Sequence, residues 1–155
     1  MRTVHLAILL LLTTTAAAAE IPPPEGKNLV RPDSKLELLF TRSAKIEGGL
    51  TEGPAVAPDG SIYFSDIPFG KDRGMILRFN PLTKKTTVFK ADSGKSNGLI
   101  FDARGYLLAC EGSGYGGRRV SRTNVQTGKA VTLTDNYQGK RLNAPNDLCL
   151  DAAGR

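Results

Sequence analysis

Short runs of hydrophobic residues alternate with turn residues along the chain from residue 35 to its last residue. The runs are four to eight residues long in the manner of strands, most are rich in aliphatic and aromatic side chains, and they follow one another between turns that contain Gly, Pro, Asn or Asp. In chain order the runs are KLELLFTR (35–42), SIYFSDI (61–67), MILRFN (75–80), KTTVFK (85–90), GLIFD (98–102), YLLACE (106–111), RRVSRT (118–123), AVTLT (130–134) and DLCLD (147–151). No stretch after residue 20 has helical periodicity, so the pattern predicts an all-β fold.

The pattern repeats. EGPAVAPDG at 52–60 returns as NGLIFDARG at 97–105 and as NDLCLDAAG at 146–154. A second register mark, RFNPLTKK at 78–85, returns 44 residues later as RTNVQTGK at 122–129. A period of 40 to 50 residues with about four short strands is typical of a β-propeller blade. The sequence holds two such blades and the first strand of a third, and because a ring needs four to eight blades we expect an N-terminal fragment of a longer protein.

The N-terminal residues precede this repeat. A basic head, an apolar run at 6–12 and four alanines at 16–19 predict a signal peptide over residues 1–19. Its apolar run is shorter than the roughly 20 residues that a membrane span needs. Residues 20–34 are rich in proline and polar side chains and predict a linker, so the propeller part is expected over 35–155. We therefore expect a secreted or periplasmic protein with no membrane contact after cleavage.

The composition limits the ligands and the catalytic groups that the sequence can support. Without residues 1–19 the formal charge falls from +6 to +5 because Arg2 is lost and no acidic residue is. The remaining basic residues stand in short groups beside turns with few aromatics between them, which favours solvated loops over a nucleic-acid surface. His5 is the only histidine and lies in the predicted signal, so a Ser-His-Asp triad or a histidine-bound zinc cannot be built from these residues alone. Acid or base chemistry would need Asp, Glu, Lys, Tyr or a metal-bound water.

Cys110 and Cys149 are the two cysteines. An exported protein can form a disulfide. Each cysteine stands in an apolar run, however, so we favour two buried free thiols. The distance between their Cα atoms would decide between the two states.

Glu52, Asn97 and Asn146 share one phase of the repeat. In a propeller the innermost strand of each blade runs along the central channel, so these three side chains would gather at similar height. One carboxylate and two amide oxygens suit Ca²⁺ or another hard divalent cation. The alternative for the two asparagines is that they cap turns. Glu52 is a poor turn residue, and its charge in a closed channel calls for a cation.

The sequence resembles the gluconolactonase and regucalcin-like family, also called the senescence-marker-protein family, of six-bladed propellers. The resemblance covers residues 36–155 and rests on LTEGPAVAPDGSIYFSDI, SNGLIFDARGYLLACEG, GGRRVSR and YQGKRLNAPNDLCLD. It implies a metal-dependent hydrolase of sugar lactones. Glu52 matches a first-blade metal ligand of the family, Asn146 a residue that meets the metal or the substrate, and Asn97 a pocket-lining position. The catalytic aspartate of the family is expected beyond Arg155, so the resemblance assigns no catalytic residue to this chain.

A glycine pattern in the second blade suggests a different ligand at first sight. Gly112, Gly114 and Gly117 fit G-x-G-x-x-G after a strand, as in dinucleotide-binding folds. That motif requires a helix next, and a hairpin pattern follows here, so the nucleotide interpretation is rejected. We expect instead a loop at the channel mouth whose Glu111, Tyr115 and Arg118 meet substrate or face water, and we favour water.

Two other functions remain open. The first is a non-catalytic extracellular propeller that binds a glycan or a protein, because the fold serves many functions. The second is an esterase or phosphotriesterase-like hydrolase on the same metal site, because Lewis-acid chemistry does not fix the substrate.

Overall fold

The computed structural model describes residues 31, 33–41 and 49–155. The predicted signal peptide and most of the predicted linker lie outside the described residues. Contacts divide the chain into two units, residues 1–38 and residues 39–155. In the first unit, the amide of Ser34 closes a turn on the carbonyl oxygen of Arg31 at 2.9 Å. The second unit carries every strand that the structure describes.

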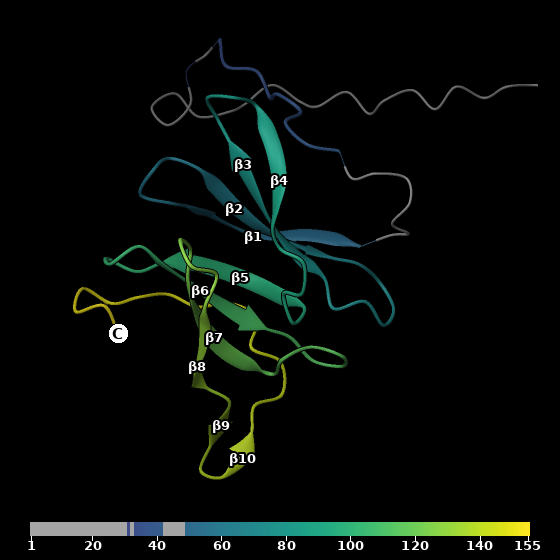
Figure 1. Cartoon of the computed structure of the whole chain (residues 1–155), viewed down its shortest axis with the longest axis vertical. Coiled ribbons are helices and arrows are strands. Elements are labelled where there is room, and N and C mark those ends of the chain that lie inside the picture. Colours follow the sequence, from purple (N-terminus) through teal and green to yellow (C-terminus); the bar gives the residue numbers. More distant parts are fainter. Residues whose placement is uncertain (1–30, 32, 42–48) are drawn as a thin grey trace, which may run out of the picture. The chain divides into compact units, whose positions relative to one another are not determined.

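The second unit contains two four-stranded antiparallel sheets, each of which is a simple meander (Figure 1). The first is β1 (Leu50–Val56), β2 (Ile62–Ile67), β3 (Met75–Asn80) and β4 (Lys85–Lys90); the second is β5 (Ser96–Phe101), β6 (Tyr106–Glu111), β7 (Arg119–Asn124) and β8 (Ala130–Thr134). A short hairpin of β9 (Asn136–Tyr137) and β10 (Lys140–Arg141) follows. The innermost strands β1 and β5 contact each other. The prediction of an all-β fold built from propeller blades is thus confirmed.

The same tight turn closes the inner strand of both blades and occurs a third time near the last residue. In each copy the amide of a glycine with positive φ donates to the carbonyl oxygen three residues earlier at 2.9 Å: Gly60 to Ala57, Gly105 to Asp102, and Gly154 to Asp151. A left-handed residue after a type I turn is a favoured hairpin connection, and glycine adopts it without steric cost. The repeated glycines in the sequence are therefore explained by this turn.

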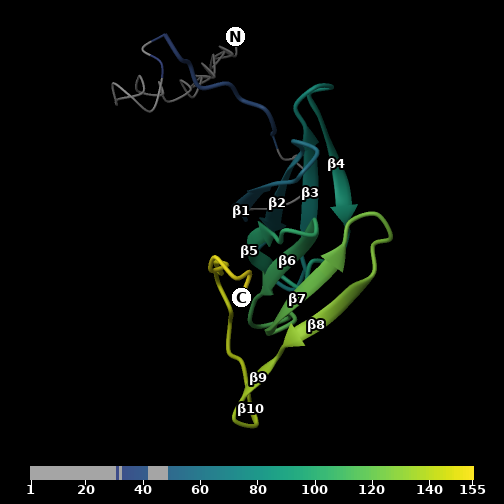
Figure 2. The same ribbon diagram turned by 90° about the vertical axis from the view of Figure 1, so that its left-hand side faces the viewer.

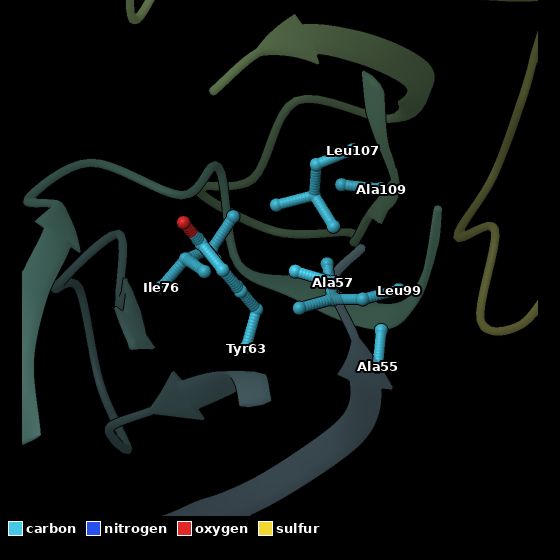
Figure 3. Close-up of a cluster of buried hydrophobic side chains, with 7 residues drawn as sticks. All are labelled: Ala55, Ala57, Tyr63, Ile76, Leu99, Leu107 and Ala109. Atoms are coloured by element: carbon cyan, nitrogen blue, oxygen red, sulfur yellow. The ribbon is translucent and has the colours of Figure 1, made fainter. Parts of the chain in front are cut away.

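The hydrophobic core lies between the two blades (Figure 3). It consists of Ala55, Ala57, Tyr63, Ile76, Leu99, Leu107 and Ala109, all of them buried. The ring of Tyr63 packs edge-to-face against Phe89 at 5.0 Å and Phe101 at 5.2 Å between centroids. Ala55 on β1 and Ala57 directly after it are small, which lets the first inner strand pack closely against the second blade. This packing joins the blades in one unit.

Two of the predicted strands do not form within the described residues. The run 35–41 and the run 147–151 contain no strand. A strand requires a hydrogen-bonded neighbour, and within the described part of the chain neither run has one. The β9–β10 hairpin was not predicted, since Gln138 and Gly139 at its turn stand between runs too short to show alternation. Figure 2 shows this hairpin beyond the end of β8.

The two cysteines are free, as predicted, but only one is buried. Cys110 lies on β6 and is 1% exposed. Cys149 is exposed, so the prediction that it is buried is wrong. It lies in the run 147–151, which pairs with no strand of the described chain and is therefore left uncovered.

Candidate functional site

Glu52 lies on β1 at the end of the first blade opposite the Gly60 turn. It is half-buried and stands across from Ser65 of β2. The pairing register of β1 shifts between Glu52 and Ala55, and that of β5 shifts between Ser96 and Leu99. The two inner strands therefore carry a bulge at the same point of the repeat. Bulges concentrate at sites where a strand must re-aim its side chains.

Gly53 brings the first inner strand against the second. A Cβ atom placed on Gly53 would lie 2.2 Å from the backbone oxygen of Asn97 and 2.8 Å from Cα of Gly98. The φ angle of Gly53 is +54°. Only glycine combines this conformation with so close an approach. Glu52 and Asn97 are thereby held on backbone segments in direct contact.

Gly98 repeats this arrangement with the segment that follows the β9–β10 hairpin. Its amide donates to the backbone oxygen of Asn146 at 2.7 Å. A Cβ atom on Gly98 would lie 2.3 Å from a carboxylate oxygen of Asp147. The structure thus brings the three predicted positions Glu52, Asn97 and Asn146 onto three adjacent segments, of which Asn146 is exposed and Asn97 half-buried.

Buried serines hold the first two of these segments together through hydrogen bonds. The hydroxyl of Ser65 donates to the backbone oxygen of Asn97 at 2.9 Å and lies 2.8 Å from the hydroxyl of Ser96. Both serines are fully buried. A third buried serine, Ser93, accepts the amide of Ser96 at 3.2 Å and donates to the carbonyl oxygen of Arg73 at 3.1 Å. The connection between the blades is therefore held by a continuous set of polar contacts.

Cys110 takes the place of Ser65 one repeat later and faces a negative charge. Burial, with Asp147 nearby, raises the pKa of the Cys110 thiol to about 11. The thiol is therefore neutral at physiological pH and is no nucleophile. Asp147 itself stands in the repeat position of Gly53 and Gly98, directly after the predicted Asn146.

Glu111 is buried, and the prediction that it faces water is wrong. Its side chain is 1% exposed and accepts two hydrogen bonds from Arg119, at 2.9 and 3.1 Å. Lys90 of the first blade lies 3.9 Å away. Cβ atoms on Gly94 and Gly117 would lie 2.4 and 1.8 Å from the same carboxylate oxygen. The loops 91–95 and 112–118 therefore close over the buried Glu111 carboxylate next to the start of β5, while Arg119 stays partly exposed.

Two basic residues, Arg73 and Lys95, link the loop 68–74 to the loops 91–95 and 112–118. Lys95 donates to the carbonyl oxygen of Gly70 at 2.5 Å, and its ammonium lies 6.0 Å from the ring centroid of Tyr115. Arg73 pairs with Asp92 at 2.8 Å and also donates to the carbonyl oxygen of Tyr115. Tyr115 is exposed, as predicted. These contacts hold the three loops together, and among the residues that the structure describes no ion pair involves Lys95.

Arg118 joins the glycine-rich loop to the segment that leads to Asn146. Its Nε donates to the carbonyl oxygens of Leu142 at 2.9 Å and Asn143 at 3.1 Å. Arg118 is half-buried, so the prediction that it faces water is wrong in part. The loop leads directly into β7, a strand and not a helix, which confirms that the glycine pattern is no dinucleotide motif.

The polar side chains on the inner segments carry oxygen atoms, the donor type that hard divalent cations prefer. Glu52 offers a carboxylate, and Asn97 and Asn146 offer amide oxygens, with the Asp147 carboxylate alongside. Oxygen donors of this kind suit calcium. Within residues 31, 33–41 and 49–155, no three His, Cys, Asp or Glu side chains gather as a metal cluster. A metal here would depend on the amides and on water as well as on carboxylates.

The comparisons with known proteins agree with this fold and this repeat. Residues 50–155 match the model of the SMP-30/gluconolactonase/LRE-like region. The chain belongs to this family. A gluconolactonase of Xanthomonas campestris is 30% identical, with a TM-score of 0.59 over 68% of this chain and 33% of that one. A second solved structure, assigned as a gluconolactonase, is 27% identical with a TM-score of 0.59, over 70% of this chain and 35% of its own.

A plant protein is similar as well. Protein STRICTOSIDINE SYNTHASE-LIKE 7 of Arabidopsis thaliana is 30% identical over 98 residues, which cover 54% of this chain and 26% of that one. The chain therefore spans about a third of the solved family members and about a quarter of the plant protein.

Sequence reasoning missed three features of the site. Asp147 could have been found, because it fills the glycine position of the repeat beside Asn146. The buried pair of Glu111 and Arg119 gave no such signal, because Glu111 ends an apolar run as an exposed residue would. The role of Ser65 depends on a contact between blades that no local pattern reveals.

No helix in the described part of the chain is long and apolar enough to cross a membrane.

Proposed function

We propose that this chain forms part of an exported, divalent-metal-dependent hydrolase of sugar lactones. The observation that carries the proposal is the contact of three inner segments that present Glu52, Asn97 and Asn146 at one end of the blades. Membership of the SMP-30/gluconolactonase/LRE-like family supports the lactonase class. Export is supported by the sequence of residues 1–19 alone.

Residues of this chain would bind the cation and fix its position. Glu52 would be the charged ligand, and Asn146 the second ligand or a contact to the substrate. Asn97 would line the pocket between them. When bound, a cation of this kind polarises a carbonyl group and stabilises the negative charge that develops during hydrolysis. We name Ca²⁺ first because all the donors are oxygens.

The surrounding residues would keep the donors in place and admit the substrate. Gly53 and Gly98 allow the inner segments to touch. Ser65 anchors the Asn97 backbone across the blade boundary. Lys95 and Tyr115 would hydrogen-bond and stack on a polar sugar ring. The carboxylate that activates water is assigned to no described residue.

The test is a substrate panel on the protein expressed from its complete coding sequence. We expect hydrolysis of glucono-δ-lactone that EDTA abolishes and Ca²⁺ restores, with slower turnover of an aryl ester and an organophosphate. Glu52→Gln should lower kcat/KM more than about tenfold. Even residues that only hydrogen-bond to a metal ligand cause a loss of about this size when they are changed. Asp72→Asn, a matched change at an exposed residue of the loop 68–74, should have no effect.

Two other results of this experiment would point to different functions. Equal rates on all three substrates would contradict a dedicated lactonase and favour a general esterase. Absence of turnover by a folded protein that binds Ca²⁺ would favour the non-catalytic propeller that recognises a glycan or a protein.

A further inference from the structure

A groove of about 630 Å³ lies at the end of the blades opposite Glu52. Its walls come from the Gly60 turn of the first blade and from the Gly105 turn and the β7–β8 turn of the second. The residues that define its chemistry are Asp59, Tyr63, Arg78, Arg104, Tyr106 and Asn124. Strand register places it far along β1, since Glu52 pairs with Ser65 near one end and Val56 pairs with Ile62 at the other. The groove is therefore separate from the inner segments of the proposed metal site.

The first blade supplies an arginine whose charge is already neutralised. Arg78 pairs with Asp59 at 2.7 Å, and its Nε donates to Ser61 at 3.0 Å. The hydrogen bond from the Ser61 amide, with Arg78 beside it, lowers the pKa of Asp59. The guanidinium of Arg78 also lies 5.9 Å from the ring centroid of Tyr63. This corner of the groove is charge-balanced.

The second blade has other residues in place of Asp59 and Ser61, the two residues that accept hydrogen bonds from Arg78 in the first blade. The two turns have the same hydrogen bonds, so Arg104 occupies the position of Asp59, and Tyr106 that of Ser61. Arg122, the counterpart of Arg78, lies over the Tyr106 ring at 4.9 Å, and its buried Nε has no hydrogen-bond partner within the described structure. The turn is instead held by Asp102, which accepts the amides of Arg104 and Tyr106 at 2.9 Å each. The side chain of Arg104 is thus not needed for the turn.

Arg104 lines the groove without an acidic partner. Among the residues that the structure describes, no hydrogen bond or ion pair neutralises its guanidinium. A guanidinium that stands beside tyrosine rings and an asparagine can recognise a planar carboxylate through paired N–H donors while the rings cover the apolar part of the ligand. Charge and shape together therefore select an anion with a flat or apolar body.

We propose that this groove binds a small organic carboxylate, with Arg104 as the anion-binding residue and Tyr106 and Tyr63 as the apolar wall. The site is independent of the lactonase function proposed above. It needs no metal and shares no residue with the Glu52 end of the blades.

The test is a calorimetric titration of the whole protein with benzoate at neutral pH, with benzamide as the uncharged ligand of the same shape. We expect saturable binding of benzoate and at least ~10-fold weaker binding of benzamide, the loss of one charge-assisted contact. Arg104→Asp should reduce benzoate affinity at least ~10-fold by the same reasoning. This variant copies the Asp-Gly turn of the first blade, so the melting temperature should not fall.

Lys85→Asp is the control, since it makes the same change in charge on β4 and Lys85 does not line the groove. Its benzoate affinity should stay within about twofold of the wild type, because a single exposed charge at a distance is screened by salt. Arg104→Lys should bind benzoate with intermediate affinity, because lysine keeps the charge but not the planar fork. The proposal is overturned if benzoate shows no saturable binding, if benzamide binds equally well, or if a folded Arg104→Asp protein retains wild-type affinity.

Discussion

The backbone oxygen of Asn97 lies 2.2 Å from the point that a Cβ atom of Gly53 would occupy. This contact joins the inner strands of the two blades at the residue next to Glu52. It also explains why the first two repeats carry glycine after their oxygen-bearing residue. The third has Asp147 there, and its carboxylate lies against Gly98. The geometry of the candidate metal site is therefore set by backbone packing between blades.

Gly53→Ala should destabilise the protein far more than Gly60→Ala. Both glycines have positive φ, so both variants bear the cost of about 1–2 kcal/mol for a left-handed alanine. Gly60 has open space around it, whereas Gly53 would meet backbone atoms of Asn97 and Gly98. Overpacking should add about 1–3 kcal/mol at Gly53. Urea denaturation of the two variants measures the difference, and equal losses would show that the blades are not packed as described.

Ser65→Ala and Ser121→Ala should differ although both serines are fully buried. Ser65 bonds to Ser96 and to the Asn97 backbone, while the Ser121 hydroxyl has no partner in the described structure. Loss of Ser65 should cost about 1–3 kcal/mol, because a buried acceptor loses its donor. Loss of the unpaired Ser121 hydroxyl should be neutral or stabilising. Thermal melts of the two variants would contradict this account if their order were reversed.

Glu111→Gln should be among the most destabilising single changes on the candidate-site face of the blades. It leaves Arg119 without its counter-charge beneath the loops that carry Gly94 and Gly117. The side chain of Arg119 is 35% exposed, so water can solvate the guanidinium that remains. We therefore expect a cost of about 1–3 kcal/mol, the range for losing a buried hydrogen-bond partner. Arg155→Ala removes an exposed pair with Asp151 and should cost less than about 1 kcal/mol. Chemical denaturation gives both values, and a cost at Glu111 as small as that at Arg155 would refute the buried pair.

The two thiols should react at very different rates. In the native protein at about pH 8, a thiol reagent should modify Cys149 at once, because it is exposed. Cys110 should react only after denaturation, because it is buried and its pKa is raised to about 11. Mass spectrometry of the peptides separates the sites. Rapid modification of native Cys110 would contradict its position on β6.

The raised pKa of Cys110 also predicts how stability depends on pH. The thiol ionises near its ordinary pKa of 9.0 in the unfolded chain, while the folded thiol keeps its proton to about pH 11. Between these values the unfolded state binds fewer protons, so the free energy of unfolding falls as pH rises. Cys110→Ala should show a shallower decline over this range than the wild type. A decline of equal slope would show that the thiol makes no contribution.

The sequence predicted the blades well because their signals are local. Alternation over short runs and glycine at each turn located the strands β2 to β8 close to their observed bounds. The same local pattern failed at 147–151, where the residues alternate suitably but the described chain offers no strand to pair with. A strand is fixed by its neighbour as much as by its own sequence.

The candidate site was predicted only in part, for a related reason. The phase of the repeat located Glu52, Asn97 and Asn146, because a propeller places equivalent residues at the same height on adjacent inner segments. The repeat could not reveal that Ser65 bonds across the blade boundary or that Glu111 is buried. Each of these contacts joins residues whose side chains carry no shared pattern along the chain. The groove at Arg104 is lined by turns of both blades that are far apart in the sequence, so no local pattern predicts it.

The most direct test of the metal site is a calorimetric Ca²⁺ titration of the protein and its Glu52→Gln variant. We expect saturable binding by the wild type, a higher melting temperature in the presence of Ca²⁺, and loss of both effects in Glu52→Gln. Asp72→Asn should bind as the wild type does. Equal Ca²⁺ binding by a folded Glu52→Gln protein, or no binding by the wild type, would contradict the claim that the three inner segments form a cation site.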